Sequence, residues 1–222
     1  MLKEKSAFEM NLSLLKDKLH EDENDDKIIE STLCQLRYIF SQTEEAWHEN
    51  LKHLKEEIKY LLICEAPPWS STNPRYFYLH PGGQLFDTVW KVFFYGQQKI
   101  TPYQCLAKEG FLLIDSLPYS MSYNTTYRKS DNYLNLLKAY MPWWLGKLNN
   151  SRLTFSKDLK IAFGYYWNGK QLIHACGGSI TIRGYIYTFN NSHIISHKGS
   201  RYLPDEKALK NIYKITKISN CP

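Results

Sequence analysis

Short apolar runs alternate along the chain with longer segments in which apolar residues recur at helical spacing. Each run ends at polar or turn-forming residues, as in strands that are buried on both faces of a parallel sheet. The pattern therefore predicts an α/β fold. The expected strands cover residues 61–64, 111–115 and 160–164, with a fourth at 185–189 or at 193–195.

The segments between these runs predict helices, because their apolar residues repeat every three or four positions. Pro142 is expected to kink or break the helix that contains it. The acidic segment 21–26 is expected to be a solvated linker that caps the helix after it. The predicted helices cover residues 6–20, 28–40, 46–58, 85–96, 102–108 and 133–148, and a last helix begins at about residue 205.

Composition is that of a globular protein, with 222 residues, 43% hydrophobic and 23% charged. The formal net charge of +6 is compatible with a polyanionic partner but does not require one. Tyr, Trp and Phe make up 15% of the chain, and aromatic rings beyond the needs of a core can stack on bases. A lysine stripe in the last helix is interpreted as a solvated face.

The five cysteines are scattered and include no Cys-x-x-Cys pair. This spacing argues against a zinc or iron–sulfur site and against a disulfide framework, so no cofactor is expected. No stretch approaches the roughly 18 apolar residues of a membrane span, and no apolar signal region follows Met1. We therefore expect a cytoplasmic protein without a membrane partner.

The first two predicted strands end in the same way, in a carboxylate and a proline-bearing loop. Glu65 precedes Pro67 and Pro68, and Asp115 precedes Pro118. Ligands of open parallel sheets bind beyond the carboxyl ends of the strands, so the two carboxylates are expected to share one crevice. Two alternatives are open for Asp115, which could also cap a loop or pair with a Lys or Arg.

Three segments together resemble the uracil-DNA glycosylase superfamily, over roughly residues 60–215. Cys64-Glu65-Ala66-Pro67-Pro68 resembles its first motif, Gly-Glu-Ala-Pro-Gly. The strand 111–115 is similar to a strand that presents an Asn to the base, and His197-Lys198-Gly199-Ser200 is similar to the last motif, His-Pro-Ser. Departures are Cys64 and Pro68 in place of glycines, Lys198 in place of proline and Asp115 in place of Asn.

This resemblance implies a three-layer α/β/α sandwich on a short, mostly parallel four-stranded sheet. Residues 58–222 would form this glycosylase-like domain, and residues 1–57 a helical extension in front of it. The cysteines that hold an iron–sulfur cluster in some branches of the superfamily are absent, so no cluster is carried over.

The resemblance also implies a DNA glycosylase, which hydrolyses the N-glycosidic bond of a base turned out of the stack. Glu65 would act on water near C1′, and His197 would donate a hydrogen bond to the departing base. An ionised Asp115 only accepts hydrogen bonds, which favours a modified or amino-bearing base. Base contacts are expected from Tyr76, Phe77, Tyr78 and Tyr119, and contacts to the nucleic-acid strand from Ser70, Arg75, Lys198, Ser200, Arg201 and Tyr202.

Several alternatives stay open from the residues alone. His197 could be a structural histidine, many of the aromatic residues could serve the core, and Arg75 could pair with either carboxylate. The protein could also hydrolyse free nucleotides, or bind nucleic acid without catalysis. A role in DNA repair or in defence against foreign DNA is the expected biological setting of the glycosylase reading.

Overall fold

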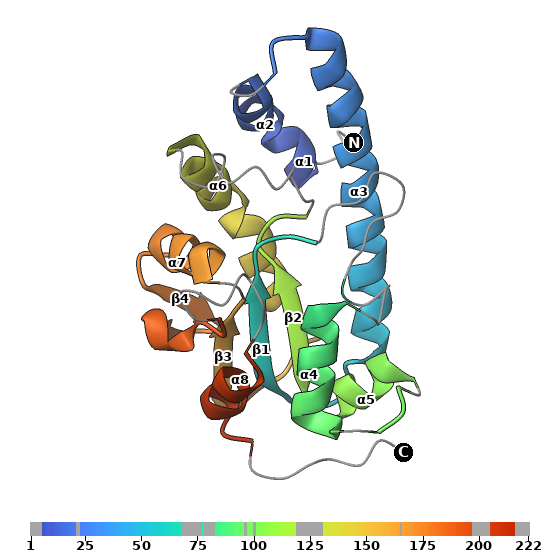
Figure 1. Cartoon of the computed structure of the whole chain (residues 1–222), viewed down its shortest axis with the longest axis vertical. Coiled ribbons are helices and arrows are strands. Elements are labelled where there is room, and N and C mark those ends of the chain that lie inside the picture. The colour runs from blue at the N-terminus through green and yellow to red at the C-terminus, as the bar shows by residue number, and fades with distance from the viewer. Residues whose placement is uncertain are drawn as a thin grey trace.

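The computed structural model of the chain describes residues 6–20, 23–67, 77, 83–95, 97–99, 101–118, 131–164, 166–196 and 205–215. It is a mixed α/β fold built on a parallel sheet of three strands in the order β2-β1-β3 (Figure 1). The strands are β1 (Ile58–Cys64), β2 (Phe111–Asp115) and β3 (Phe155–Phe163). The three strands predicted at 61–64, 111–115 and 160–164 are thus confirmed.

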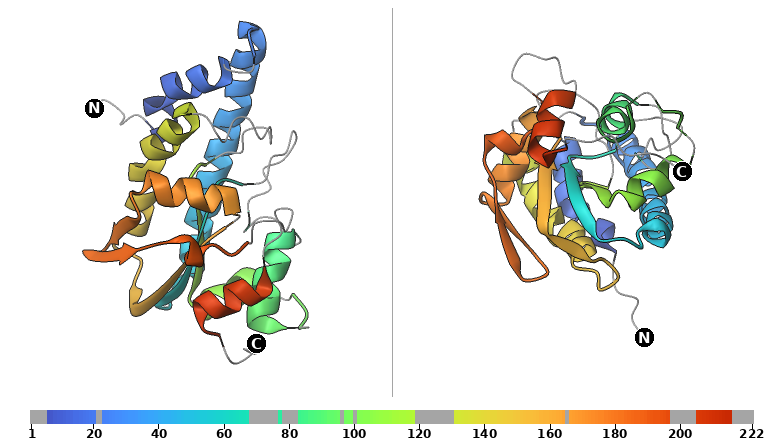
Figure 2. Two further views of the ribbon diagram at one scale, coloured as in Figure 1. Left: turned by 60° about the vertical axis from the view of Figure 1, so that its left-hand side comes forward. Right: turned by 90° about the horizontal axis from the view of Figure 1, so that it is seen from below.

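Helices lie on both sides of this sheet, as the end-on view in Figure 2 shows. Their bounds are α1 (Ala7–Met10), α2 (Leu12–His20), α3 (Asp26–His53), α4 (Gln84–Phe94), α5 (Pro102–Lys108), α6 (Asp131–Leu148), α7 (Tyr166–Ala175) and α8 (Glu206–Tyr213), with a 3-10 turn η2 (Asn191–His193).

Successive residues of β1 point to opposite faces of the sheet and enter two separate hydrophobic clusters. Leu61 and Ile63 pack with buried residues of α3 and α6, and we call this the α3/α6 cluster. Leu62 and Cys64 pack with buried residues of α4 and α8, which form the α4/α8 cluster. Burial on both faces explains why β1 is apolar at consecutive positions rather than at alternate ones.

The N-terminal helices share this core. Phe8 of α1, Leu15 of α2 and Ile29 of α3 belong to the α3/α6 cluster, together with Leu61 of the central strand. The N-terminal segment therefore packs against one face of the sheet.

The helix α3 is one continuous helix of 28 residues where two helices were expected. The segment 41–45 separates the two predicted helices, but it contains neither glycine nor proline to end a helix. Thr43 is buried within it. Its hydroxyl lies within hydrogen-bond distance of two backbone carbonyl oxygens, that of Ile39 at 2.9 Å and that of Pro118 at 2.8 Å. A polar residue on the buried face therefore does not end the helix.

Pro142 does not end α6 either, because the helix runs from Asp131 to Leu148 with this proline inside it. Tyr140 and Trp144, on either side of Pro142, are fully buried in the α3/α6 cluster. Their packing holds both halves of the helix against the core, which offsets the hydrogen bond that proline cannot make.

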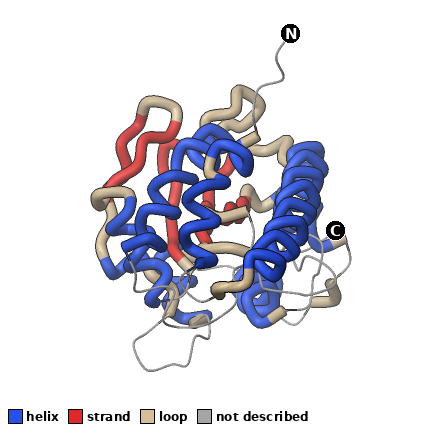
Figure 3. Tube along the Cα trace, turned by 90° about the horizontal axis from the view of Figure 1, so that it is seen from above, coloured by secondary structure: helices blue, strands red, loops and turns tan. Residues whose placement is uncertain are grey.

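Of the two candidates for a fourth strand, residues 185–189 do not join the parallel sheet. Residues 185–188 form β5 (Tyr185–Thr188), which pairs antiparallel with β4 (Ser179–Ile182) in a separate hairpin beside the sheet (Figure 3). Arg183 and Gly184 both have positive φ, which is the geometry of a tight hairpin turn. The second candidate, residues 193–195, extends the sheet at Ile194, through an isolated parallel bridge to Phe163.

The described helices include none that is long and apolar enough to cross a membrane. Cys34, Cys64 and Cys176 have free thiols, whereas Cys105 of α5 is disulfide-bonded. The spacing of the cysteines argues against a disulfide framework and did not predict this bond. The cytoplasmic location remains a prediction.

Candidate active site

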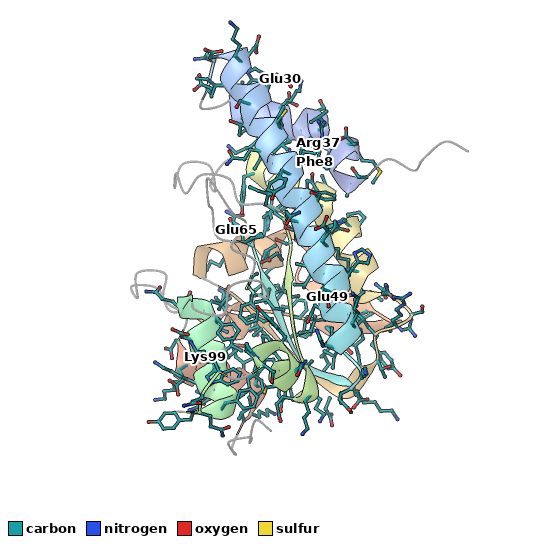
Figure 4. All side chains as sticks on the ribbon, turned by 90° about the vertical axis from the view of Figure 1, so that its right-hand side faces the viewer. Phe8, Glu30, Arg37, Glu49, Glu65 and Lys99 are labelled. Atoms are coloured by element: carbon teal, nitrogen blue, oxygen red, sulfur yellow. The ribbon has the colours of Figure 1, made fainter. Side chains whose placement is uncertain are left out.

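Glu65 and Asp115 lie at the carboxyl ends of the two neighbouring strands β1 and β2. Cys64 and Asp115 are register partners, and Glu65 is the residue after Cys64. Glu65 is 8% exposed and Asp115 is 5% exposed. Figure 4 shows Glu65 at the upper end of the strands, far from the labelled Glu49 and Lys99. The parallel register therefore places two buried acidic residues at neighbouring strand ends, close enough for the charge of Glu65 to raise the pKa of Asp115.

Backbone contacts hold Glu65 in place beyond the end of the strand. Its carbonyl oxygen accepts hydrogen bonds from the backbone N–H of Leu117, at 2.7 Å, and from the hydroxyl of Ser116, at 2.9 Å. Ser116 is fully buried. The pairing of β1 with β2 thus continues past both strands and fixes the direction in which Glu65 leaves the sheet.

The side chain of Glu65 is oriented by Tyr133, in the first turn of α6. The phenolic O–H of Tyr133 donates to Oε1 of Glu65, and both residues are buried. A hydrogen bond from a neutral donor stabilises a carboxylate without neutralising it. The Tyr133 hydroxyl therefore fixes the Glu65 side chain on the α3/α6 side of the sheet edge.

Asp115 has a different environment from Glu65. Its Oδ2 is buried and accepts no hydrogen bond in the described part of the chain. Burial raises the pKa of Asp115 to about 8, with the positive charge of Lys147 lowering it and the negative charge of Glu65 raising it. At neutral pH Asp115 is therefore mainly a neutral carboxylic acid, and the premise of an ionised Asp115 does not hold there.

Lys147 of α6, whose charge lowers the pKa of Asp115, forms an ion pair with another residue. Its Nζ lies 2.5 Å from Oε1 of Glu44 on α3 and 4.0 Å from the ring centroid of Trp143. The Lys147 side chain is 10% exposed, and burial lowers its pKa. Lys147 therefore lowers the pKa of Asp115 through its charge while it is paired with Glu44.

Cys64 completes the immediate surroundings of Asp115. Its thiol is buried, and burial first, then the charges of Asp115 and Glu65, hold its pKa well above the usual range. The thiol is thus protonated and unreactive at neutral pH. A Cβ added to Gly164, at the end of β3, would lie 3.0 Å from the Cys64 sulfur, so glycine is what lets these two strand ends approach.

Residues 194–196 lie beside β3, the outer strand on the other side of β1 from β2, and they precede the last motif in the sequence. The backbone N–H of Ile195 donates to Phe163, and the N–H of Asp205 donates to Ile195, both at 2.9 Å. Ser196 follows, 2% exposed. Ile195 and Asp205, which lie on either side of the segment that carries His197, are therefore joined by a backbone hydrogen bond beside the end of β3.

Phe77 is the one predicted base-stacking residue within the described chain. Its ring lies 5.1 Å from the ring of Phe86 and 5.9 Å from that of Phe111, and it is 8% exposed. Phe77 thus packs in the α4/α8 cluster and offers little open face to a base. The other predicted contacts lie outside the described residues and stay predictions: Ser70, Arg75, Tyr76, Tyr78, Tyr119, His197, Lys198, Ser200, Arg201 and Tyr202.

Two groups that shape the site were missed in the sequence, Tyr133 and the Lys147–Glu44 pair. Both depend on which face of a helix packs against the sheet. The spacing of apolar residues does not show which side chains of a helix reach the ends of the strands. The available signal for Tyr133 was its place at the start of the helix that follows the Asp115 loop.

The described residues contain no group of three or more His, Cys, Asp or Glu side chains arranged to hold a metal ion. Comparisons with protein-family models, with curated proteins and with solved structures found no match. The functional argument therefore rests on the geometry of the site.

Proposed function

We propose that the protein is a DNA glycosylase-like hydrolase that cleaves the N-glycosidic bond of a base turned out of DNA. The observation that carries this proposal is the pair of buried carboxyl groups, Glu65 and Asp115, at neighbouring strand ends. Tyr133 orients the first of them, and the second lacks a hydrogen-bond partner at Oδ2 among the described residues.

The proposed reaction needs negative charge near C1′, because positive charge develops on the sugar as the bond to the base breaks. Glu65 would supply that charge and accept a proton from the attacking water. A general base of this kind contributes a rate factor of about 10²–10⁴. His197 would donate to the departing base, as the motif resemblance implies.

The proposed fold is an α/β/α sandwich with four strand positions, in which residues 194–195 occupy the fourth. The bridge from Ile194 to Phe163 and the hydrogen bond from Ile195 support this assignment. In such a sheet Ser196 would lie at a strand end on the same edge as Glu65. The motif resemblance at the next residue supports His197 as a partner of the carboxylates.

The test is a strand-cleavage assay on single- and double-stranded oligonucleotides that carry uracil, hypoxanthine, adenine, cytosine or a 5-modified cytosine. Alkali converts abasic sites into strand breaks. We expect breaks with wild-type protein and a loss of 100-fold or more in Glu65→Gln. Glu49→Gln is the matched control, because Glu49 is an exposed glutamate on α3.

Other outcomes would identify the alternatives. DNA binding that persists in Glu65→Gln, with no abasic product from any base, would replace the proposal with a non-catalytic binding module. Hydrolysis of free nucleotides at a rate independent of DNA and of salt would replace it with a small-molecule hydrolase.

A further inference from the structure

Asp115 lies in a buried position, where an ionised carboxylate is energetically unfavourable. It is 5% exposed, and the buried Oδ2 has no hydrogen-bond partner in the described part of the chain. Among the described residues, the titratable groups that act on it are Cys64 and Glu65 from β1 and its end, and Lys147 from α6, which is engaged with Glu44 of α3. Burial and a carboxyl oxygen without a hydrogen-bond donor both favour the neutral acid over the carboxylate.

A neutral carboxylic acid differs from a carboxylate in what it can present to a base. It offers one O–H donor and one C=O acceptor in the same plane. The amidine edge of cytosine or adenine, a ring nitrogen beside an exocyclic amine, offers the complementary acceptor and donor. Two parallel hydrogen bonds can therefore form without charge on either side.

We propose that Asp115 is a catalytic proton donor that pairs with the amidine edge of a cytosine- or adenine-type base and protonates its ring nitrogen as the base departs. This inference rests on the proposed function and names the substrate class of that site. A substituent at C5 of cytosine leaves the amidine edge unchanged, so 5-modified cytosines belong to the same class.

The step balances with the two carboxyl groups alone. The Asp115 O–H proton moves to the ring nitrogen, and the electrons of the C1′–N bond move into the ring. Water adds to C1′ and gives its proton to Glu65. The products are a neutral base and an abasic sugar, and the proton on Glu65 returns through water to Asp115.

The environments of the two carboxyl groups fit this division of roles. Glu65 accepts a hydrogen bond from Tyr133, which suits an ionised base. Burial raises the pKa of Asp115 to about 8, close to the pH at which a general acid is most effective. Pairs of carboxyl groups with opposed environments are how one site supplies both an acid and a base at neutral pH.

The test measures base release from oligonucleotides with one cytosine, adenine, uracil or 3-deazacytosine, between pH 6 and pH 9. In 3-deazacytosine a C–H replaces the ring nitrogen, so the amine remains and the proton acceptor is lost. We expect release of the amino-bearing base and at least 100-fold slower release of 3-deazacytosine where cytosine is the target. The wild-type rate should fall about tenfold per pH unit above pH 8.

Asp115→Asn should keep the binding of the target oligonucleotide and lose 100-fold or more in the rate of base release, because an amide pairs but does not give up a proton. Asp158→Asn, at an exposed aspartate of β3, is the matched control and should release base at the wild-type rate. The wild-type pH profile and the 3-deazacytosine result test the proposal without any variant.

Equal release by Asp115→Asn and wild type would overturn the inference, as would release of uracil in preference to the amino-bearing bases. In either case an effect of Glu65→Gln would leave the proposed function standing. Release of no base from any oligonucleotide would overturn both.

Discussion

Cys64 and Asp115 face each other across the β1–β2 pair as the last residues of their strands. Burial raises the pKa of both groups, so at neutral pH the thiol is protonated and Asp115 is mainly the neutral acid. Glu65, the residue after Cys64, is the second acidic residue of the site. Protonation of Asp115 has consequences for stability that do not depend on function.

The first prediction concerns stability against pH. The pKa of Asp115 is about 8 in the folded protein and lies near 3.8 in the unfolded chain, so the native state binds the extra proton between these values. The free energy of unfolding should therefore decrease as pH rises from 4 to 8. Urea unfolding should show a gain of about 1–3 kcal/mol for Asp115→Asn over wild type between pH 5 and pH 8.

The control for this measurement is Asp158→Asn, which removes an exposed aspartate from β3. It should keep the pH dependence of the wild type. Parallel stability curves for wild type and Asp115→Asn would show that Asp115 is ionised in the native state.

A second prediction concerns the hydrogen bond from Tyr133 to Glu65. Tyr133→Phe removes the hydroxyl and leaves a buried carboxylate oxygen without that donor. We expect a loss of about 1–3 kcal/mol in the free energy of unfolding, and slower base release. Tyr38→Phe removes an exposed phenol from α3 and should match the wild type in both measurements.

The third prediction concerns Lys147, whose charge lowers the pKa of Asp115. Lys147→Met should move the alkaline fall in base release to higher pH. It should also destabilise the fold by about 1–3 kcal/mol, because Glu44 loses its partner.

Adding Glu44→Gln to Lys147→Met separates these two effects. The double variant should recover part of the stability and keep the shifted pH profile. An unshifted profile in both variants would show that Lys147 does not influence Asp115.

A fourth prediction concerns the contact between α3 and the loop after β2. Thr43→Val keeps the shape of the side chain and removes the hydroxyl that bonds Pro118. A loss of about 1–2 kcal/mol is expected in urea unfolding. Thr32→Val is the matched control on the same helix, because the Thr32 hydroxyl donates to the local carbonyl of Ile28. An equal effect of the two substitutions would mean that the Pro118 contact contributes nothing.

The sequence was sufficient for the parallel strands because their signal is local. An apolar run such as 111–114 is buried on both faces, so no partner is needed to recognise it. The run at 185–188 has the same appearance but follows Arg183-Gly184, whose backbone makes a hairpin turn. Local turn geometry decided that strand's partner, and the spacing of its apolar residues did not reveal it.

Glu65 and Asp115 could be brought together from the sequence, because parallel strand ends meet at one edge of a sheet. The protonation state of Asp115 could not be predicted from the sequence. It depends on burial and on the ion pair of Lys147 with Glu44, two residues that are distant in sequence. The same limit applies to Tyr133, which reaches Glu65 from a helix packed across the sheet.

The most direct test of the proposed hydrolysis is the detection of free base by mass spectrometry after DNA is incubated with the protein. The abasic sites in the same sample are counted in parallel. Free base and abasic sites should appear in equal amounts with wild type and with Glu49→Gln, and at least 100-fold more slowly with Glu65→Gln. Base release at the wild-type rate by Glu65→Gln, or no free base from wild-type protein, would contradict the assignment of Glu65 as the catalytic base.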